Sequence, residues 1–160
     1  MHKRKLPPGW ASTPLEKIAK VQTGIAMGKA VNGLTVSIPY LRVANVQDGH
    51  VDLSTMKEIS VKPAEVDRYS LKKGDVLFTE GGDFDKLGRG TVWNAEIEPC
   101  LHQNHVFAVR PDAECLLPEF LAFLAASEHG RRYFQLSSKQ STNLASINST
   151  QLKQFPVLLP

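Results

Sequence analysis

Cysteine is scarce in this sequence, and so are the patterns that would direct the chain into a membrane or out of the cell. It has 2 cysteines, Cys100 and Cys115, too few for a structural zinc site or a disulfide framework. The apolar runs fall well short of the roughly 20 residues that a membrane-spanning helix needs. The basic N-terminus continues into Leu6-Pro7-Pro8-Gly9 instead of an apolar signal core. We therefore expect a cytoplasmic chain without a membrane span.

The sequence also lacks a complete motif for binding nucleotide or metal. The segment 24–30 is similar to a phosphate-binding loop, but its glycines are too close together and Ala30 has no hydroxyl to hold magnesium. His102 and His105 enter a predicted strand, where side chains at this spacing do not share a face. Metal ligation by this pair is therefore disfavoured.

An acidic cluster in a glycine-rich stretch is the remaining candidate for catalysis. Glu80, Asp83 and Asp85 could hold magnesium in a nuclease, which needs several rigidly held oxygen ligands. They lie beside Lys86 and Arg89, so a solvated loop with local ion pairs is the favoured interpretation. The sequence has no nucleophile elbow and no helical zinc motif, and it gives no specific support for an enzyme.

What the chain does have is enough length for one globular domain and a small excess of positive charge. Its 160 residues can bury a core without metals or cross-links, and 42% hydrophobic and 22% charged residues are ordinary for a soluble protein. A net charge of +3 permits binding to a polyanion, but many proteins without such a partner carry as much. Charge therefore does not decide the function.

The residue pattern predicts an α+β domain built from short elements. Thr13-Pro14-Leu15-Glu16 has the form of a capping box with proline at the first helical position, which predicts a helix over 13–21. Apolar residues at helical spacing predict a helix pair or one bent helix over 118–136, with Gly130 at the joint. Asn148 or Ser149 is expected to cap a last helical turn before a closing strand at 157–159. Strands are predicted at 36–46, 51–53, 59–61, 75–79, 91–93, 97–101 and 105–109.

We expect these strands to form a twisted, mainly antiparallel sheet or a partial barrel, with helices packed around it and recognition loops on one side. Asp75 and Trp93 are assigned to structure. The aromatic side chains expected in the core are Trp10, Tyr40, Phe78, Phe107, Phe120 and Phe134.

Two loops carry groups suited to contacting a polyanion. Residues 81–90 hold four glycines between two predicted strands, and Lys86 and Arg89 offer charged donors suited to phosphate or guanine. Residues 137–143 combine hydroxyl, amide and ammonium groups, a mixture that contacts sugars, phosphates and base edges. From composition alone, an ordinary surface linker is the favoured interpretation of this second loop.

Several segments together resemble the specificity subunits of type I restriction-modification enzymes, and the resemblance covers nearly the whole chain. Each segment is a weak signal, but their order and spacing are specific. The segments are 6–10 (LPPGW), 38–46 (IPYLRVANV), 73–78 (KGDVLF), 87–90 (LGRG), 102–107 (HQNHVF) and 155–160 (FPVLLP).

The resemblance implies that residues 1–160 form a single DNA target recognition domain. Such a domain reads one half of a bipartite target in double-stranded DNA. Modification subunits then methylate adenine with S-adenosylmethionine, and a restriction subunit cuts. The chain itself is expected to be non-catalytic and to bind no cofactor. It would be the N-terminal half of a longer subunit, ending before a spacer helix, or else a half-sized subunit that dimerises.

The resemblance also turns the polar loop residues into candidates for contact with DNA. The candidates for base or near-base contact are Arg42, Lys86, Arg89, Gln103 and Asn104, and those for phosphate contact are Lys29, Lys139, Ser141 and Thr142. Structural roles stay open for some of them: Arg42 could pair with a carboxylate, and the Gln103 and Asn104 side chains could form hydrogen bonds with buried backbone groups. The alternatives for the whole chain are a protein-interaction module or decoy on the same fold and, third, a metal-dependent nuclease.

Overall fold

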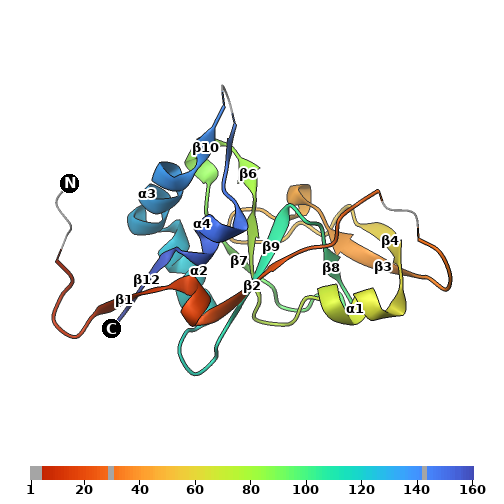
Figure 1. Ribbon diagram of the computed structural model, residues 1–160, viewed down its shortest axis with the longest axis horizontal. Helices are drawn as coiled ribbons and strands as arrows, with labels where there is room; N and C mark the ends of the chain where they lie inside the picture. Colours follow the sequence, from red (N-terminus) through yellow and green to blue (C-terminus); the bar gives the residue numbers. More distant parts are fainter. Residues whose placement is uncertain (1–4, 29–30, 142–143) are drawn as a thin grey trace.

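The computed structural model describes residues 5–28, 31–141 and 144–160, with the side chain of Lys86 left out, and these ranges form an α+β fold (Figure 1). The strands in these ranges are β1 Ala11–Pro14, β2 Ala19–Thr23, β3 Val36–Leu41, β4 Lys57–Val61, β5 Val76–Thr79, β6 Gly81–Gly82, β7 Thr91–Val92, β8 Leu101–His102, β9 Val106–Pro111, β10 Lys139–Gln140, β11 Ala145–Ser146 and β12 Pro156–Leu159. The helices are α1 Pro63–Tyr69, α2 Pro118–Ala126, α3 Glu128–Ser137 and α4 Ser149–Lys153, with 3-10 turns η1 Leu15–Lys17, η2 Val43–Asn45 and η3 Phe84–Lys86. None of the described helices is long and apolar enough to cross a membrane.

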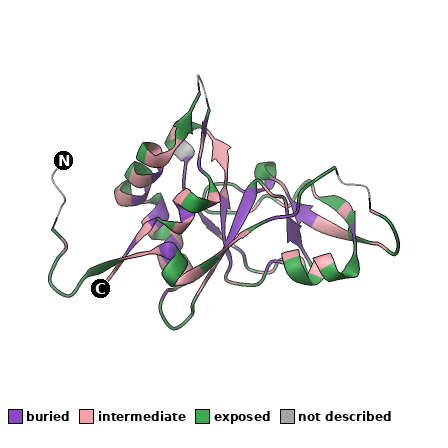
Figure 2. Ribbon diagram, viewed as in Figure 1, coloured by how far each residue is buried: buried purple, intermediate pink, exposed green. Residues whose placement is uncertain are grey.

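A four-stranded antiparallel sheet of order β2-β9-β5-β7 lies at the centre of the molecule (Figure 1). Successive side chains of a strand point to opposite faces, so each central strand supplies two cores. In β9, Phe107 and Val109 enter one core while Val106 and Ala108 enter another. Because both faces are covered, β9 is a continuous apolar run that is buried over Val106–Val109 (Figure 2).

The first core lies between the central sheet and the C-terminal helices. Its largest fully buried side chains are Leu15, Phe78, Leu121, Phe134, Ile147, Leu152 and Phe155. The strand β12 pairs antiparallel with β1, which brings the two ends of the described chain together. This core therefore depends on residues from both ends of the sequence.

The second core lies on the opposite face of the central sheet and includes Leu41, Leu77 and Trp93. A third, smaller core of Ile25, Tyr40, Val61 and Leu101 joins the sheet β4-β3-β8 to α1. Within that sheet β3 pairs antiparallel with β4 and parallel with β8. The expected mainly antiparallel α+β architecture is confirmed, although the strands are distributed over small sheets rather than one.

The helix predicted over 13–21 is wrong. The segment forms β1, the single turn η1 and β2, because β1 hydrogen-bonds to β12 and β2 pairs with β9 over its whole length. Pro14 precedes the turn, which has no side-chain cap, and Leu15 is fully buried. Pairing on both sides of Leu15 replaces the helix that the local capping pattern favours.

Other predicted strands are shorter than expected. The predicted strand 36–46 ends at Leu41 and is followed by η2, while 51–53 contributes only an isolated bridge between Val51 and Val46. The predicted strand 97–101 is reduced to Leu101–His102, preceded by a cis Glu98–Pro99 peptide bond. The helix α1 was not predicted, although Pro63 stands at its first position and the Glu65 side chain accepts a hydrogen bond from the Lys62 N–H.

The C-terminal half follows the prediction more closely. A helix pair covers most of 118–136, Asn148 and Gln151 form the capping box of α4, and β12 closes the chain. The joint between α2 and α3 is Ser127, not Gly130, so that expected position is wrong. Gly130 has a different role: a β-carbon there would lie 2.1 Å from the Ala125 carbonyl oxygen, so its absence lets the two helices meet closely.

Most of the expected structural side chains are buried. Tyr40, Phe78, Phe107 and Phe134 are buried, Phe120 packs against the first core, and both Asp75 and Trp93 lie inside. Trp10 is 39% exposed, so its predicted place in the core is wrong. It lies just before β1 and belongs to none of the three cores.

Candidate nucleic-acid interface

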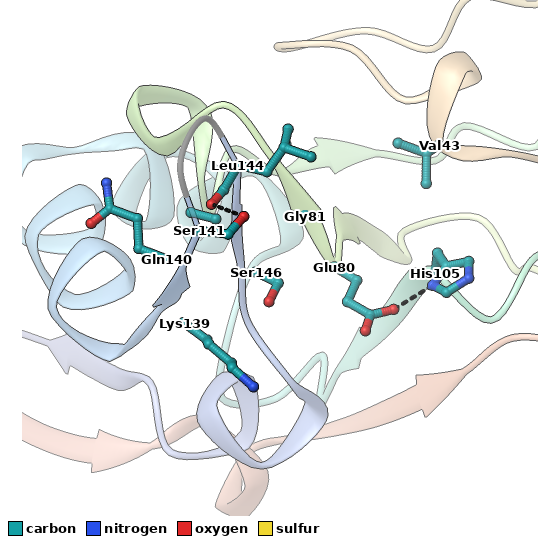
Figure 3. A pocket seen from close by; sticks show the side chains of 11 residues that line it. Val43, Glu80, Gly81, His105, Lys139, Gln140, Ser141, Leu144 and Ser146 are labelled. Atoms are coloured by element: carbon teal, nitrogen blue, oxygen red, sulfur yellow. Dashed lines mark hydrogen bonds and ion pairs between the residues drawn. The ribbon is translucent and has the colours of Figure 1, made fainter.

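An open cleft of about 550 Å³ lies between the β6-β11-β10 sheet and the turn that precedes β9 (Figure 3). It brings together segments that are far apart in the sequence. The lining residues are Val43, Glu80, Gly81, Gly82, His105, Lys139, Gln140, Ser141, Leu144, Ala145 and Ser146.

Backbone pairing holds Glu80 at the floor of this cleft. The Glu80 N–H donates to the His105 carbonyl at 2.9 Å, and the Ile147 N–H donates to the Glu80 carbonyl at 2.7 Å. Next to it, a β-carbon on Gly81 would lie 3.0 Å from the Ala145 carbonyl oxygen, so glycine allows β6 to approach β11 closely. Gly81, Gly82 and Ala145 have small side chains or none and therefore leave space in the cleft. The Glu80 backbone is held by hydrogen bonds on both sides.

The Glu80 carboxylate forms a hydrogen bond with His105. The distance from His105 Nδ1 to Glu80 Oε2 is 2.5 Å, and the two side chains are 39% and 54% exposed, for Glu80 and His105 respectively. A carboxylate accepts and does not donate, so Nδ1 carries the shared hydrogen. Figure 3 shows the carboxylate extending toward the imidazole across the floor of the cleft. The pair thus presents polar atoms to solvent in a fixed arrangement.

The strands β10 and β11 form the opposite wall of the cleft. Lys139, Gln140 and Ser141 are exposed there, and the Ser141 N–H donates to the Leu144 carbonyl at 2.8 Å. Leu144 is 59% exposed at this wall, and Val43 is 37% exposed across from it (Figure 3). The cleft therefore combines an ammonium, an amide and a hydroxyl with two apolar side chains at its edges.

The turn at Gln103 and Asn104 lies next to His105 and is held by the loop after β2. The Asn104 N–H donates to the Ile25 carbonyl at 3.0 Å, and the Gln103 N–H donates to the Leu41 carbonyl at 2.9 Å. A β-carbon on Gly24 would lie 2.1 Å from the His102 carbonyl oxygen, so glycine allows this contact. Both amide side chains are partly exposed beside the cleft, and their contact with DNA stays a prediction.

The two predicted arginines have partners within the protein. Arg42 donates from Nη2 to the Thr55 carbonyl at 3.1 Å, and Arg89 Nη1 lies 3.0 Å from Asp48 Oδ2. The Asp48 side chain is 61% exposed, and a surface ion pair of this kind contributes little stability, so Arg89 can exchange it for another anion. Their role in base contact stays a prediction.

The structure does not describe every predicted contact residue. Lys29 and Thr142 lie outside the described residues, as does the side chain of Lys86, whose backbone belongs to η3. Of the predicted phosphate contacts, it therefore brings Lys139 and Ser141 into the cleft.

The sequence analysis did not identify Glu80 and His105 as a pair. They are 25 positions apart, and each was considered only with its sequence neighbours. The sequence did contain a signal for this pair, because Glu80 directly follows the buried strand β5 and His105 directly precedes the buried strand β9. When two such strands pair antiparallel, the end of one lies beside the start of the other.

Other polar groups of the described residues have structural roles. His102 is buried, its Nδ1 lies 2.6 Å from the Val106 carbonyl oxygen, and burial lowers its pKa. Arg110 donates twice to buried Asp75, at 2.8 and 3.0 Å, and these hydrogen bonds raise the pKa of the guanidinium. Burial raises the pKa of the Cys100 thiol to about 12, so this cysteine stays protonated. Among the described residues, no group of three or more His, Cys, Asp or Glu could hold a metal ion.

The fold is similar to that of solved chains from type I restriction-modification systems. A chain from a structure on complex assembly and conformational transition of the type I R-M system superposes with a TM-score of 0.70 at 18% identity, covering 99% of this chain and 40% of that one. The HsdS subunit from Thermoanaerobacter tengcongensis superposes with a TM-score of 0.59 at 20% identity, covering 98% of this chain and 34% of that subunit.

Sequence comparison identifies the family. A family model described as type I restriction modification DNA specificity domain matches residues 7–160, so the chain belongs to this family. The type I restriction enzyme StySPI specificity subunit of Salmonella potsdam is 30% identical over 156 residues, which are 95% of this chain and 33% of that protein. The chain spans about a third of the length of the curated relatives that it matches.

Proposed function

We propose that this chain is a DNA target recognition domain that reads one half of a bipartite sequence in double-stranded DNA. The observation that carries the proposal is the match to a DNA specificity domain over residues 7–160. The cleft supports it, because it gathers polar groups from four separate segments on a rigid strand scaffold. Hydrogen-bonding groups fixed in this way are what base-edge readout requires.

Within this proposal the DNA contacts fall into two groups. Lys139 and Ser141 would bind phosphate from the β10–β11 wall, and Lys29 and Thr142 are proposed as further phosphate contacts. The bases would be read by Arg42, Lys86, Arg89, Gln103 and Asn104.

The reactive steps are proposed to belong to other subunits. The chain would be one recognition domain of a longer or dimeric specificity subunit in the cytoplasm. It would have no catalytic activity and no cofactor of its own. Modification subunits would methylate adenine with S-adenosylmethionine, and a restriction subunit would cut DNA. The relatives' names as specificity subunits support this division of work.

The test is selection from a pool of random duplexes, followed by gel-shift titration of the recovered sequences at several salt concentrations. We expect the chain to enrich particular sequences and to bind them less tightly as salt rises. Lys139→Ala should weaken binding equally for all sequences and reduce the slope of log K against log salt by about 0.9, since one phosphate contact is lost. Lys73→Ala removes the same charge from an exposed lysine that does not line the cleft, and it should leave that slope nearly unchanged.

The two alternative functions give different results in the same assay. Failure to enrich any duplex would contradict the proposal and favour the alternative of a protein-interaction module or decoy on this fold. Cleavage of duplexes by the purified chain, dependent on magnesium, would identify a nuclease instead.

A further inference from the structure

Glu80 is an unusual side chain for a cleft that faces DNA. Phosphate groups repel a carboxylate, so an acidic residue at this position weakens non-specific binding. Its backbone is nevertheless fixed from two sides and its carboxylate is oriented by His105. A carboxylate oriented in this way is suited to a partner that donates hydrogen bonds.

The major groove contains such donors only on the exocyclic amino groups of cytosine and adenine. The cytosine base itself has no major-groove acceptor beside its N4 amino group, whereas adenine places its own N7 acceptor next to its N6 amino group. A carboxylate has only acceptor atoms, so it would repel adenine N7 while it accepts from N6. Cytosine is therefore the better partner for this acceptor.

His105 leaves one carboxylate oxygen for this contact. Nδ1 of His105 contacts Oε2 of Glu80, so Oε1 lies outside that hydrogen bond. We propose that Glu80, positioned by His105, accepts a hydrogen bond from the N4 amino group of a cytosine and specifies one C·G pair of the target.

This inference rests on the proposed function, and the pooled-duplex selection tests both. The wild-type chain should select a motif that contains a required C·G pair. Glu80→Gln should lose the preference for cytosine at that one position by about tenfold or more, because a glutamine amide both donates and accepts. Preferences at the other positions should stay as in the wild type.

A matched control separates base contact from charge. Glu119→Gln removes the same charge from an exposed residue of α2 that does not line the cleft, and it should keep the wild-type motif. His105→Gln should weaken the cytosine preference at the same position, since the carboxylate loses its orienting partner. Thermal unfolding of each variant checks that it is folded.

A modified base gives the decisive measurement. At the required position, cytosine is replaced by a pyrimidin-2-one that lacks the 4-amino group. The wild-type chain should lose about tenfold in affinity for this duplex, while Glu80→Gln should show a smaller difference between the two duplexes, because its amide oxygen is an uncharged acceptor.

Each outcome separates the two proposals. If the wild-type chain selects no sequence, the proposed function fails. If it selects a motif that Glu80→Gln leaves unchanged, or if the altered position requires adenine, only the cytosine contact is overturned.

Discussion

At the scale of single residues, the buried polar side chains of this domain have defined partners that explain why they are tolerated. His102 is 1% exposed and is bonded to the Val106 carbonyl, and Asp75 is 1% exposed and is bonded to Arg110. Removing a charge from water is costly, so the buried imidazole is held neutral and its pKa is lowered. His102 therefore links stability to pH.

We predict that acid destabilises the fold partly through His102. In the unfolded chain its pKa is about 6.5, and in the folded chain it is lower, so below about pH 6.5 the unfolded state binds more protons. The stabilising contribution is complete above that pH and is lost as the pH falls toward the folded pKa, by at most about 1.4 kcal/mol per pH unit.

Urea unfolding of the wild type and His102→Gln between pH 7.5 and 5 measures this contribution. The free energy of unfolding of the variant should fall less steeply with pH, because glutamine does not titrate. Parallel pH curves would show that His102 does not contribute.

At the scale of elements, a close contact between Gly88 and Phe134 joins the glycine-rich loop to α3. Gly88 has a φ of +75°, and a β-carbon there would lie 1.8 Å from Cδ2 of Phe134 in α3. The ring of Phe134 belongs to the first core and stacks on Phe155 at a centroid distance of 5.0 Å. The contact between Gly88 and Phe134 therefore fixes the end of the loop that carries Lys86 and Arg89.

Gly88→Ala should separate this loop from α3. We expect a loss of about 2 to 4 kcal/mol in the free energy of unfolding, since alanine is strained at positive φ and its methyl overlaps the buried ring. Gly49→Ala is the matched control: Gly49 has the same φ of +75° but nothing lies within 4 Å of its β-carbon.

The control should therefore lose only about 1 kcal/mol, the cost of the backbone strain. Equal losses in the two variants, measured by urea unfolding, would show that Phe134 does not hold the loop.

At the scale of the whole molecule, the central sheet joins the first two cores into one unit. The strands β5 and β9 place alternate side chains in the first and second cores. If these strands unfolded, both cores would be disrupted together. Trp93 is fully buried in the second core, whereas α2, α3 and α4 cover the first. The two halves of the protein thus carry separate spectroscopic probes.

We predict one cooperative unfolding transition. In a Trp10→Phe variant, which removes the exposed tryptophan, the fluorescence of Trp93 and the far-ultraviolet circular dichroism of the helices should change at the same urea concentration. Transitions at different concentrations would show that the two cores unfold independently.

The sequence predicted the C-terminal half better than the N-terminal half. Capping at Asn148 and the apolar spacing of α2 are local signals, and the structure follows them. At Thr13–Glu16 an equally good local signal failed, because β12, more than 140 positions away, pairs with β1. Local propensity determines the secondary structure of a segment only where no distant strand competes for its backbone hydrogen bonds.

The same distinction applies to the candidate site. Lys139 and Ser141 were predicted from their residue types within one polar loop, and the structure places them in the cleft. The pair of Glu80 and His105 was not predicted, because it forms only when β5 and β9 align.

The sequence by itself determined the class of the domain, the positions of most strands and the absence of a complete catalytic motif. These depend on residue type and on spacing along the chain. Only the tertiary structure decided which loop ends share a cleft and which side chains orient one another there. Contacts between distant strands set that geometry, and the order of residues along a single segment contains no record of them.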